Sequence, residues 1–229
     1  MKPTLPAAVL VLLPCLASTA AAEGKTEVSL LAGVSLLDVT HETRLGTRQP
    51  QVFPVGPNGP IPAVEIRVRQ RLGGSFVQAL RVARFLGSRA AIEAGLAIAP
   101  GHDLQRDEFV SCDPPGPLCP RSPAGPALPD RRTTARVTAY HYDVGATYEL
   151  LGGGVRPFLG VSLGGVSNDA PEGTATDFAL GLSAGARLSF AGRVGMRLEV
   201  QDRLIPDHFI SGRLEHDLHV RAGLAFRLP

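Results

Sequence analysis

The sequence predicts an all-β fold: an eight-stranded antiparallel up-and-down transmembrane β-barrel, with a polar, side-chain-filled lumen and two long proline-rich extracellular loops. Eight segments alternate between apolar and polar or small residues, and a period of two places the two sets on opposite faces of a strand. Each segment reaches the roughly nine to eleven residues that a tilted strand needs to cross a bilayer. Short and long links alternate between the segments, as in barrels with turns on one side of a membrane and loops on the other.

The first residues predict a secretory signal that is cleaved. Lys2 is followed by an apolar stretch over residues 5–16 and by three alanines at residues 20–22, the order of a signal peptide and its cleavage site. The apolar stretch is short and contains two prolines, which argues against a retained anchor helix. We therefore divide the chain into a signal peptide, residues 1–22, and a barrel domain, residues 23–229.

The predicted strands follow the alternation. In the last strand every even-numbered residue from Leu218 to Leu228 is apolar, and the first strand repeats this from Val28 to Leu36. The eight predicted strands cover residues 27–37, 76–86, 89–99, 136–150, 157–166, 177–190, 193–204 and 216–228.

The links between these strands differ in length and composition. Small or glycine-rich pairs and triplets at residues 87–88, 152–154 and 191–192 are typical of tight hairpin turns. Proline-rich segments at residues 38–74 and 100–135 are far longer, so we predict that they form extracellular loops.

Residues 64–72, inside the first long segment, also alternate. Counting them as a membrane strand would give nine strands, whereas single-chain bacterial barrels have even numbers. We interpret them as a loop strand or as an extension of the second strand beyond the bilayer.

The face opposite the apolar stripe carries the charge. In a soluble barrel these side chains would enter a dry core at high cost, whereas in a lipid-embedded barrel they enter the lumen. With eight strands the lumen is just wide enough for side chains to fill it, so we expect arginine–carboxylate pairs and water in place of an open pore. A gated path for ions or small solutes and selective ligand binding are the alternatives. The predicted lumen network comprises Arg81, Glu93, His141, Asp143, Glu149, Arg187, Arg197, Glu199, Arg203, His219, Arg221 and Arg227.

Two cysteines remain after the predicted cleavage, Cys112 and Cys119. Structural zinc sites need four ligands, and no histidine lies near these two. In an oxidising compartment a disulfide is the expected state, with two free thiols as the alternative. The formal net charge of +2 gives no field that favours nucleic acid, so we expect no nucleic-acid partner, and we predict neither a metal nor a cofactor.

The signal peptide, the strand rhythm and the terminal run of residues 223–228 together resemble the small eight-stranded outer-membrane β-barrel family of Gram-negative bacteria, of the OmpA/OmpX size class. The resemblance implies a monomer in the outer membrane, in contact with lipid and lipopolysaccharide. It also implies assembly by the barrel-insertion machinery, for which Phe226 and Leu228 are the candidate signal. Such barrels usually end in an aromatic residue, whereas Phe226 here precedes Leu228 and Pro229.

Catalysis is not indicated. His208, Ser211 and Glu215 resemble the His-Ser-Glu set of lipid A deacylases in composition, but the His–Ser spacing is one residue longer. On a strand that spacing points the two side chains to opposite faces. The acidic residues Asp103, Asp107, Glu108 and Asp113 do not match a calcium loop.

Three functions follow from these observations. The first is a non-enzymatic outer-membrane protein with a structural or surface-interaction role in the cell envelope. The alternative is a narrow channel for ions or small solutes, and the third is a lipid-modifying outer-membrane enzyme.

Overall fold

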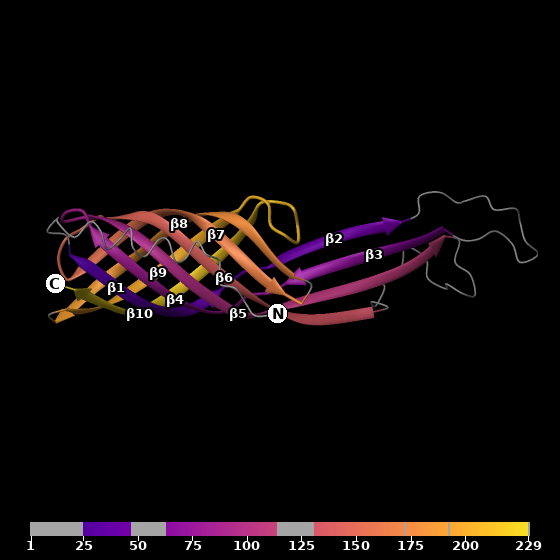
Figure 1. Cartoon of the computed structure of the whole chain (residues 1–229), viewed down its shortest axis with the longest axis horizontal. Helices are drawn as coiled ribbons and strands as arrows, with labels where there is room; N and C mark the ends of the chain where they lie inside the picture. Colours follow the sequence, from indigo (N-terminus) through magenta and orange to yellow (C-terminus); the bar gives the residue numbers. More distant parts are fainter. Residues whose placement is uncertain (1–24, 47–62, 114–130, 172, 192, 229) are drawn as a thin grey trace, which may run out of the picture.

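The computed structural model describes residues 25–46, 63–113, 131–171, 173–191 and 193–228 (Figure 1). These residues form ten antiparallel strands in one sheet. Among them no helix has the length and apolarity needed to cross a membrane. The strands are β1 (Thr26–Ser35), β2 (Val39–Gly46), β3 (Ala63–Leu72), β4 (Ser75–Phe85), β5 (Ala90–Asp113), β6 (Arg131–Glu149), β7 (Val155–Ala170), β8 (Gly173–Ala191), β9 (Val194–Ile205) and β10 (Glu215–Leu228).

Eight of the strands close into a barrel. Their order is β5-β4-β1-β10-β9-β8-β7-β6, and the pairing of β5 with β6 joins the two ends of this series. Each predicted strand segment lies within or largely overlaps one of these eight strands. The predicted fold class, a closed eight-stranded antiparallel barrel, is confirmed.

The other two strands, β2 and β3, belong to a projection that extends away from the barrel (Figure 1). Strand β4 pairs with the first half of β5, whereas β3 pairs with its second half, from Leu104 to Asp113. Strand β3 therefore continues the line of β4, and residues 64–72 extend the second barrel strand, one of the two interpretations that the sequence suggested. We call the sheet of β2, β3 and the far halves of β5 and β6 the projection.

The segments predicted as long loops, residues 38–74 and 100–135, contain strand over part of their length. Both segments contain strand, because the long β5 and β6 continue past the barrel and the hairpin of β2 and β3 pairs beside them. Strand β5 passes from barrel to projection through a register shift between Ala99 and His102, and Gly101 in this bulge has a φ of 78°. A side chain rarely adopts that conformation, which explains the glycine.

The two ends of the barrel differ as the link lengths predicted. The tight turns after β4, β6 and β8 lie at the end where β1 begins and β10 finishes, since Thr26 pairs with Leu228. The projection and the link between β9 and β10, residues 206–214, lie at the other end.

First and last strands meet at a tightly packed seam. Gly223 of β10 pairs with Leu31 of β1, and a Cβ atom at Gly223 would overlap the carbonyl oxygen of Leu30. Only glycine therefore permits this approach, which closes the barrel.

The outer surface of the barrel is apolar. Large apolar side chains that the strand alternation turns outward are among the most exposed of the chain, and in a water-soluble monomer so wide an apolar surface would be unusual. Examples are Leu30, Phe76, Leu159, Val161, Leu163, Phe178, Leu180, Leu182, Val200, Val220 and Leu224. The opposite face of the same strands is charged and buried.

Candidate functional site

The barrel lumen holds the charged side chains. Of the residues predicted for the lumen network, all are buried except Arg227, whose side chain is 29% exposed at the end of β10. They come from six of the eight barrel strands, β4, β5, β6, β8, β9 and β10, so the network is built from residues far apart in the sequence.

Arg187 is the centre of the layer nearest the tight turns. Its guanidinium donates from Nε to Glu27 at 3.1 Å, from Nη1 to Glu149 at 3.0 Å, and from Nη2 to Glu93. One cation thus ties together three carboxylates from β1, β6 and β5.

A second guanidinium shares this layer. Arg197 donates to both oxygens of Glu93, at 2.9 and 2.8 Å, and to Glu199 at 2.8 Å. The ring of Phe158 lies against both guanidiniums, with centroid distances of 4.7 Å to Arg187 and 4.6 Å to Arg197. These cation–π contacts place the cations against the barrel wall.

The next layer links Arg81 and Arg203 through Asp143. Arg81 donates to Asp143 at 3.1 Å and to Gln201 at 2.9 Å, and Arg203 donates to Asp143 at 2.7 Å. Arg221 donates to Glu199 and Gln201 and thereby joins this layer to the first. Because the pairs are buried, removing one partner would leave an uncompensated charge at considerable cost.

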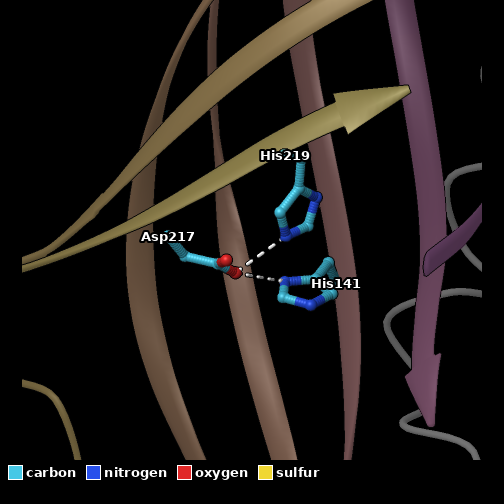
Figure 2. A group of neighbouring side chains, drawn as sticks. All are labelled: His141, Asp217 and His219. Atoms are coloured by element: carbon cyan, nitrogen blue, oxygen red, sulfur yellow. Dashed lines mark hydrogen bonds and ion pairs between the residues drawn. The ribbon is translucent and has the colours of Figure 1, made fainter. Parts of the chain in front are cut away.

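The third layer contains His141, Asp217 and His219, whose side chains point toward one another across the lumen (Figure 2). Asp217 accepts from His219 Nε2 at 2.8 Å and from the Ser35 hydroxyl at 2.7 Å. His141 Nδ1 lies 3.8 Å from Asp217 Oδ2. In the ring of strands β6 and β10 are opposite, so this contact crosses the barrel.

Apolar side chains close the lumen toward the projection. Most of the barrel's buried apolar cluster lies near the strand ends on that side, and a second group, the mouth cluster, lies at the junction with the projection. Phe209 and Ile210 of the β9–β10 loop pack on the mouth cluster. The mouth cluster comprises Leu37, Val39, Leu72 and Val137.

Sequence reasoning left out several buried members of the network, namely Glu27, Gln201 and Asp217 and the hydroxyls of Ser35 and Thr147. The alternation of these strands did place them on the lumen face. Glu27 lies on the same face of its strand as Ser29, and Asp217 lies on the same face as His219. Glu27 lies at the very start of its strand, where the alternation has few residues to support it.

The remaining predicted sites are placed as follows. Phe226 and Leu228 face outward at the end of β10. Cys119 and the side chain of Cys112 lie outside the described residues, so the disulfide remains a prediction.

The described structure does not bring His208 and Ser211, the candidate catalytic pair, into hydrogen-bond contact. His208 Nδ1 accepts the Ile210 amide at 3.3 Å, and the Ser211 hydroxyl accepts the Arg213 amide at 3.3 Å. Among the described residues no hydrogen bond joins Ser211 to His208. A serine outside the reach of its base is not activated as a nucleophile.

Charged side chains on the projection pair at its surface. Arg69 donates to Glu42 at 3.2 Å, and Arg132 donates to Asp107 at 2.8 Å. The hydrogen bond from Arg132 holds the pKa of the Asp107 carboxyl below its usual range. Asp107 and Glu108, two of the four acidic residues considered for calcium, are therefore paired with arginines, since Glu108 lies 3.3 Å from Arg106.

The fold can be compared with solved structures. The outer membrane protein OprG from Pseudomonas aeruginosa aligns with a TM-score of 0.54 and 10% identity, over 90% of this chain and 96% of that one. The chain has the fold of the small outer-membrane β-barrels.

Two further structures align less well. Neisserial surface protein A gives a TM-score of 0.45 at 12% identity, over 89% of this chain and 97% of that one. Ail of Yersinia pestis gives 0.37 at 10% identity, over 90% and 100% of the two chains. Of these three structures, OprG is the one whose alignment supports the fold assignment. No known protein-family model matches the sequence, and no curated protein is significantly similar to it.

Proposed function

We propose that this protein is a non-enzymatic outer-membrane barrel that is closed to solutes and anchors the projection at the cell surface. The observation that supports this most strongly is the filled lumen. Three layers of buried polar contacts and the mouth cluster cross the described part of the barrel, and an eight-stranded barrel has little room beyond its own side chains.

Two features support a place in a bilayer. The outer face of the barrel is apolar, and a closed barrel pairs its backbone groups within the protein, as lipid requires. The predicted signal peptide favours export to the outer membrane of a Gram-negative bacterium. In that membrane the barrel would be a monomer surrounded by lipid and lipopolysaccharide, inserted by the barrel-insertion machinery. We assign the end with the projection to the outside, as the long-loop side of such barrels.

The projection is the part of the molecule suited to contact with partners. Within the described residues, strand β2 pairs with β3 alone, and residues 131–137 of β6 pair with β5 but not with β7. Both edges of this sheet therefore offer unpaired backbone groups, which other chains can use for strand addition. Charged side chains along both edge strands protect the sheet from unspecific pairing.

Planar-bilayer recordings test the closed lumen. The folded protein is expected to give no steady conductance steps at a protein concentration at which a reference porin gives them. Steady, ion-selective steps would support the narrow channel instead.

Protease treatment of intact cells tests the orientation. Trypsin is expected to cut the projection at exposed arginines such as Arg131 and Arg132, and to leave the barrel intact. Protection of the projection until the cells are lysed would reverse the orientation.

An assay of lipid A acylation with the wild type and Ser211→Ala tests the third candidate function, a lipid-modifying enzyme. We expect no deacylation by either protein.

A further inference from the structure

Asp217 differs from the other carboxylates of the lumen. Glu27, Glu93, Asp143, Glu149 and Glu199 each form an ion pair with at least one arginine. Among the described residues Asp217 is the one buried lumen carboxylate with no arginine partner. A buried negative charge without a cation is costly, so Asp217 needs a positive charge that the arginines do not supply.

His141 is the second unusual group. Its side chain is 1% exposed, and neither ring nitrogen has a hydrogen bond within the described structure. Buried polar atoms are nearly always paired, so two unpaired nitrogens on one ring indicate a missing partner. One of them, Nδ1, faces the Asp217 carboxylate (Figure 2).

The geometry brings the two observations together. Ligand atoms of His141, Asp217 and His219 all lie within 4.8 Å of one another. In a tetrahedral zinc site with bonds of about 2.0–2.1 Å, neighbouring ligand atoms are about 3.3 Å apart. The separations here, 2.8 Å from Asp217 to His219 and 3.8 Å from Asp217 to His141, lie on either side of that value.

We propose that His141 Nδ1, Asp217 Oδ2 and His219 Nε2 bind one divalent transition-metal ion, with Zn²⁺ as the best match and water as the fourth ligand. Two imidazoles and one carboxylate suit zinc and its first-row neighbours, whereas calcium and magnesium require oxygen ligands. The ion supplies the charge that Asp217 lacks and a partner for Nδ1 of His141.

The surroundings of the site act as a second shell. The Ser35 hydroxyl donates to Asp217 Oδ1 at 2.7 Å and leaves Oδ2 for the metal, as outer partners do in metal sites. Arg203 Nη1 lies 3.2 Å from His219 Nδ1. Arginine can only donate, so Nδ1 accepts in this contact and Nε2 carries the ring proton. Metal binding at Nε2 would move that proton to Nδ1 and break the contact with Arg203 Nη1, whereas the Arg203 Nη2 bond to Asp143 does not involve His219.

The ion would act as a clip across the barrel. It joins β6 to β10, which are opposite in the ring of strands, and it lies below the apolar closure of the lumen. Because that closure restricts entry, we infer that the metal is incorporated while the barrel folds. A protonated imidazole beside Asp217 is the competing source of positive charge, and it requires no metal.

The experiment refolds the chain into detergent micelles with one equivalent of Zn²⁺, or with a chelator, and measures bound zinc by mass spectrometry after gel filtration. Heat-modifiable migration on a gel identifies folded protein in every sample. We expect about one zinc per folded wild-type chain, and the absorption spectrum of a tetrahedral ion when Co²⁺ replaces Zn²⁺.

Variants locate the site. Asp217→Asn and His141→Gln are expected to weaken zinc binding more than about a hundredfold, and Ser35→Ala about ten- to a hundredfold. His216→Gln is the matched control, because His216 forms a histidine–aspartate pair with Asp202 at 2.9 Å on the exposed surface of the same barrel. It should bind zinc as the wild type does.

Folded wild-type protein that retains no zinc contradicts the proposal, and so does zinc that His216→Gln removes or that Asp217→Asn leaves in place. If a lumen variant does not fold, the zinc content and cobalt spectrum of the wild type decide alone.

Discussion

Arg187 in the lumen and Arg71 in the projection both form ion pairs, in very different surroundings. The Arg187 side chain is 2% exposed and contacts three carboxylates and an aromatic ring, whereas Arg71 is 61% exposed and reaches one carboxylate, Asp38, at 3.4 Å. Solvent screens the exposed Arg71 pair, whereas burial shields the Arg187 pairs from bulk solvent. The same residue types therefore hold the barrel together in one region and only cover a surface in the other.

The largest predicted difference between the two regions comes from removing each arginine. Arg187→Ala leaves Glu27, Glu93 and Glu149 short of a buried partner and should lower the free energy of unfolding by about 3–5 kcal/mol. Arg71→Ala should change it by less than about 1 kcal/mol. Urea unfolding in micelles measures both values, and similar losses for the two variants would contradict the distinction.

The seam between β1 and β10 sharpens the contrast between a closed barrel and an open sheet. Gly223→Ala places a methyl group against the Leu30 carbonyl, so we expect a loss of about 1–3 kcal/mol and slower folding. Thr40→Val, on the exposed edge strand β2, should be nearly neutral. Equal stability of Gly223→Ala and the wild type would show that the seam is not tightly packed.

A smaller, pH-dependent effect is expected where the two regions meet. Burial lowers the pKa of His208 in the β9–β10 loop, and the carboxylates of Asp177 and Glu215 oppose this only in part. Because the unfolded loop binds the proton more readily, the stability of the loop is present above the ordinary histidine pKa of about 6.5 and declines as the pH falls through it.

Hydrogen exchange of the Gly212 amide, which donates to the His208 carbonyl at 2.7 Å, reports opening of this loop. After correction for intrinsic rates, its protection should fall between pH 7.5 and 5.5. His208→Asn should remove most of that dependence, and an unchanged dependence would assign it to another group.

Much of this arrangement could be predicted from the sequence, because alternation fixes which side of a strand a residue faces. Arg81, Glu93 and Arg197 were placed in the lumen by parity alone. Parity does not give height along the barrel or distance across it, so the contact of His141 with Asp217, from opposite strands, had no sequence signal.

The projection was harder to predict for a different reason. Proline and glycine dominate residues 50–62 and 114–126, and that composition hid the strands on either side of them. The alternation of residues 64–72 was the one visible sign. Pairing of β3 with the far half of β5 depends on contacts between segments about 40 residues apart, which local patterns do not encode.

The central claim is that lipid surrounds the apolar face of the strands and that the ionic face is sealed inside. The chain contains no tryptophan, so single substitutions give reporters without background. On β7, Val161 is 60% exposed and Phe158 is 1% exposed. In vesicles with brominated acyl chains, fluorescence of Val161→Trp should be strongly quenched and that of Phe158→Trp nearly unaffected. Equal quenching of the two folded variants, or the reverse order, would contradict the account.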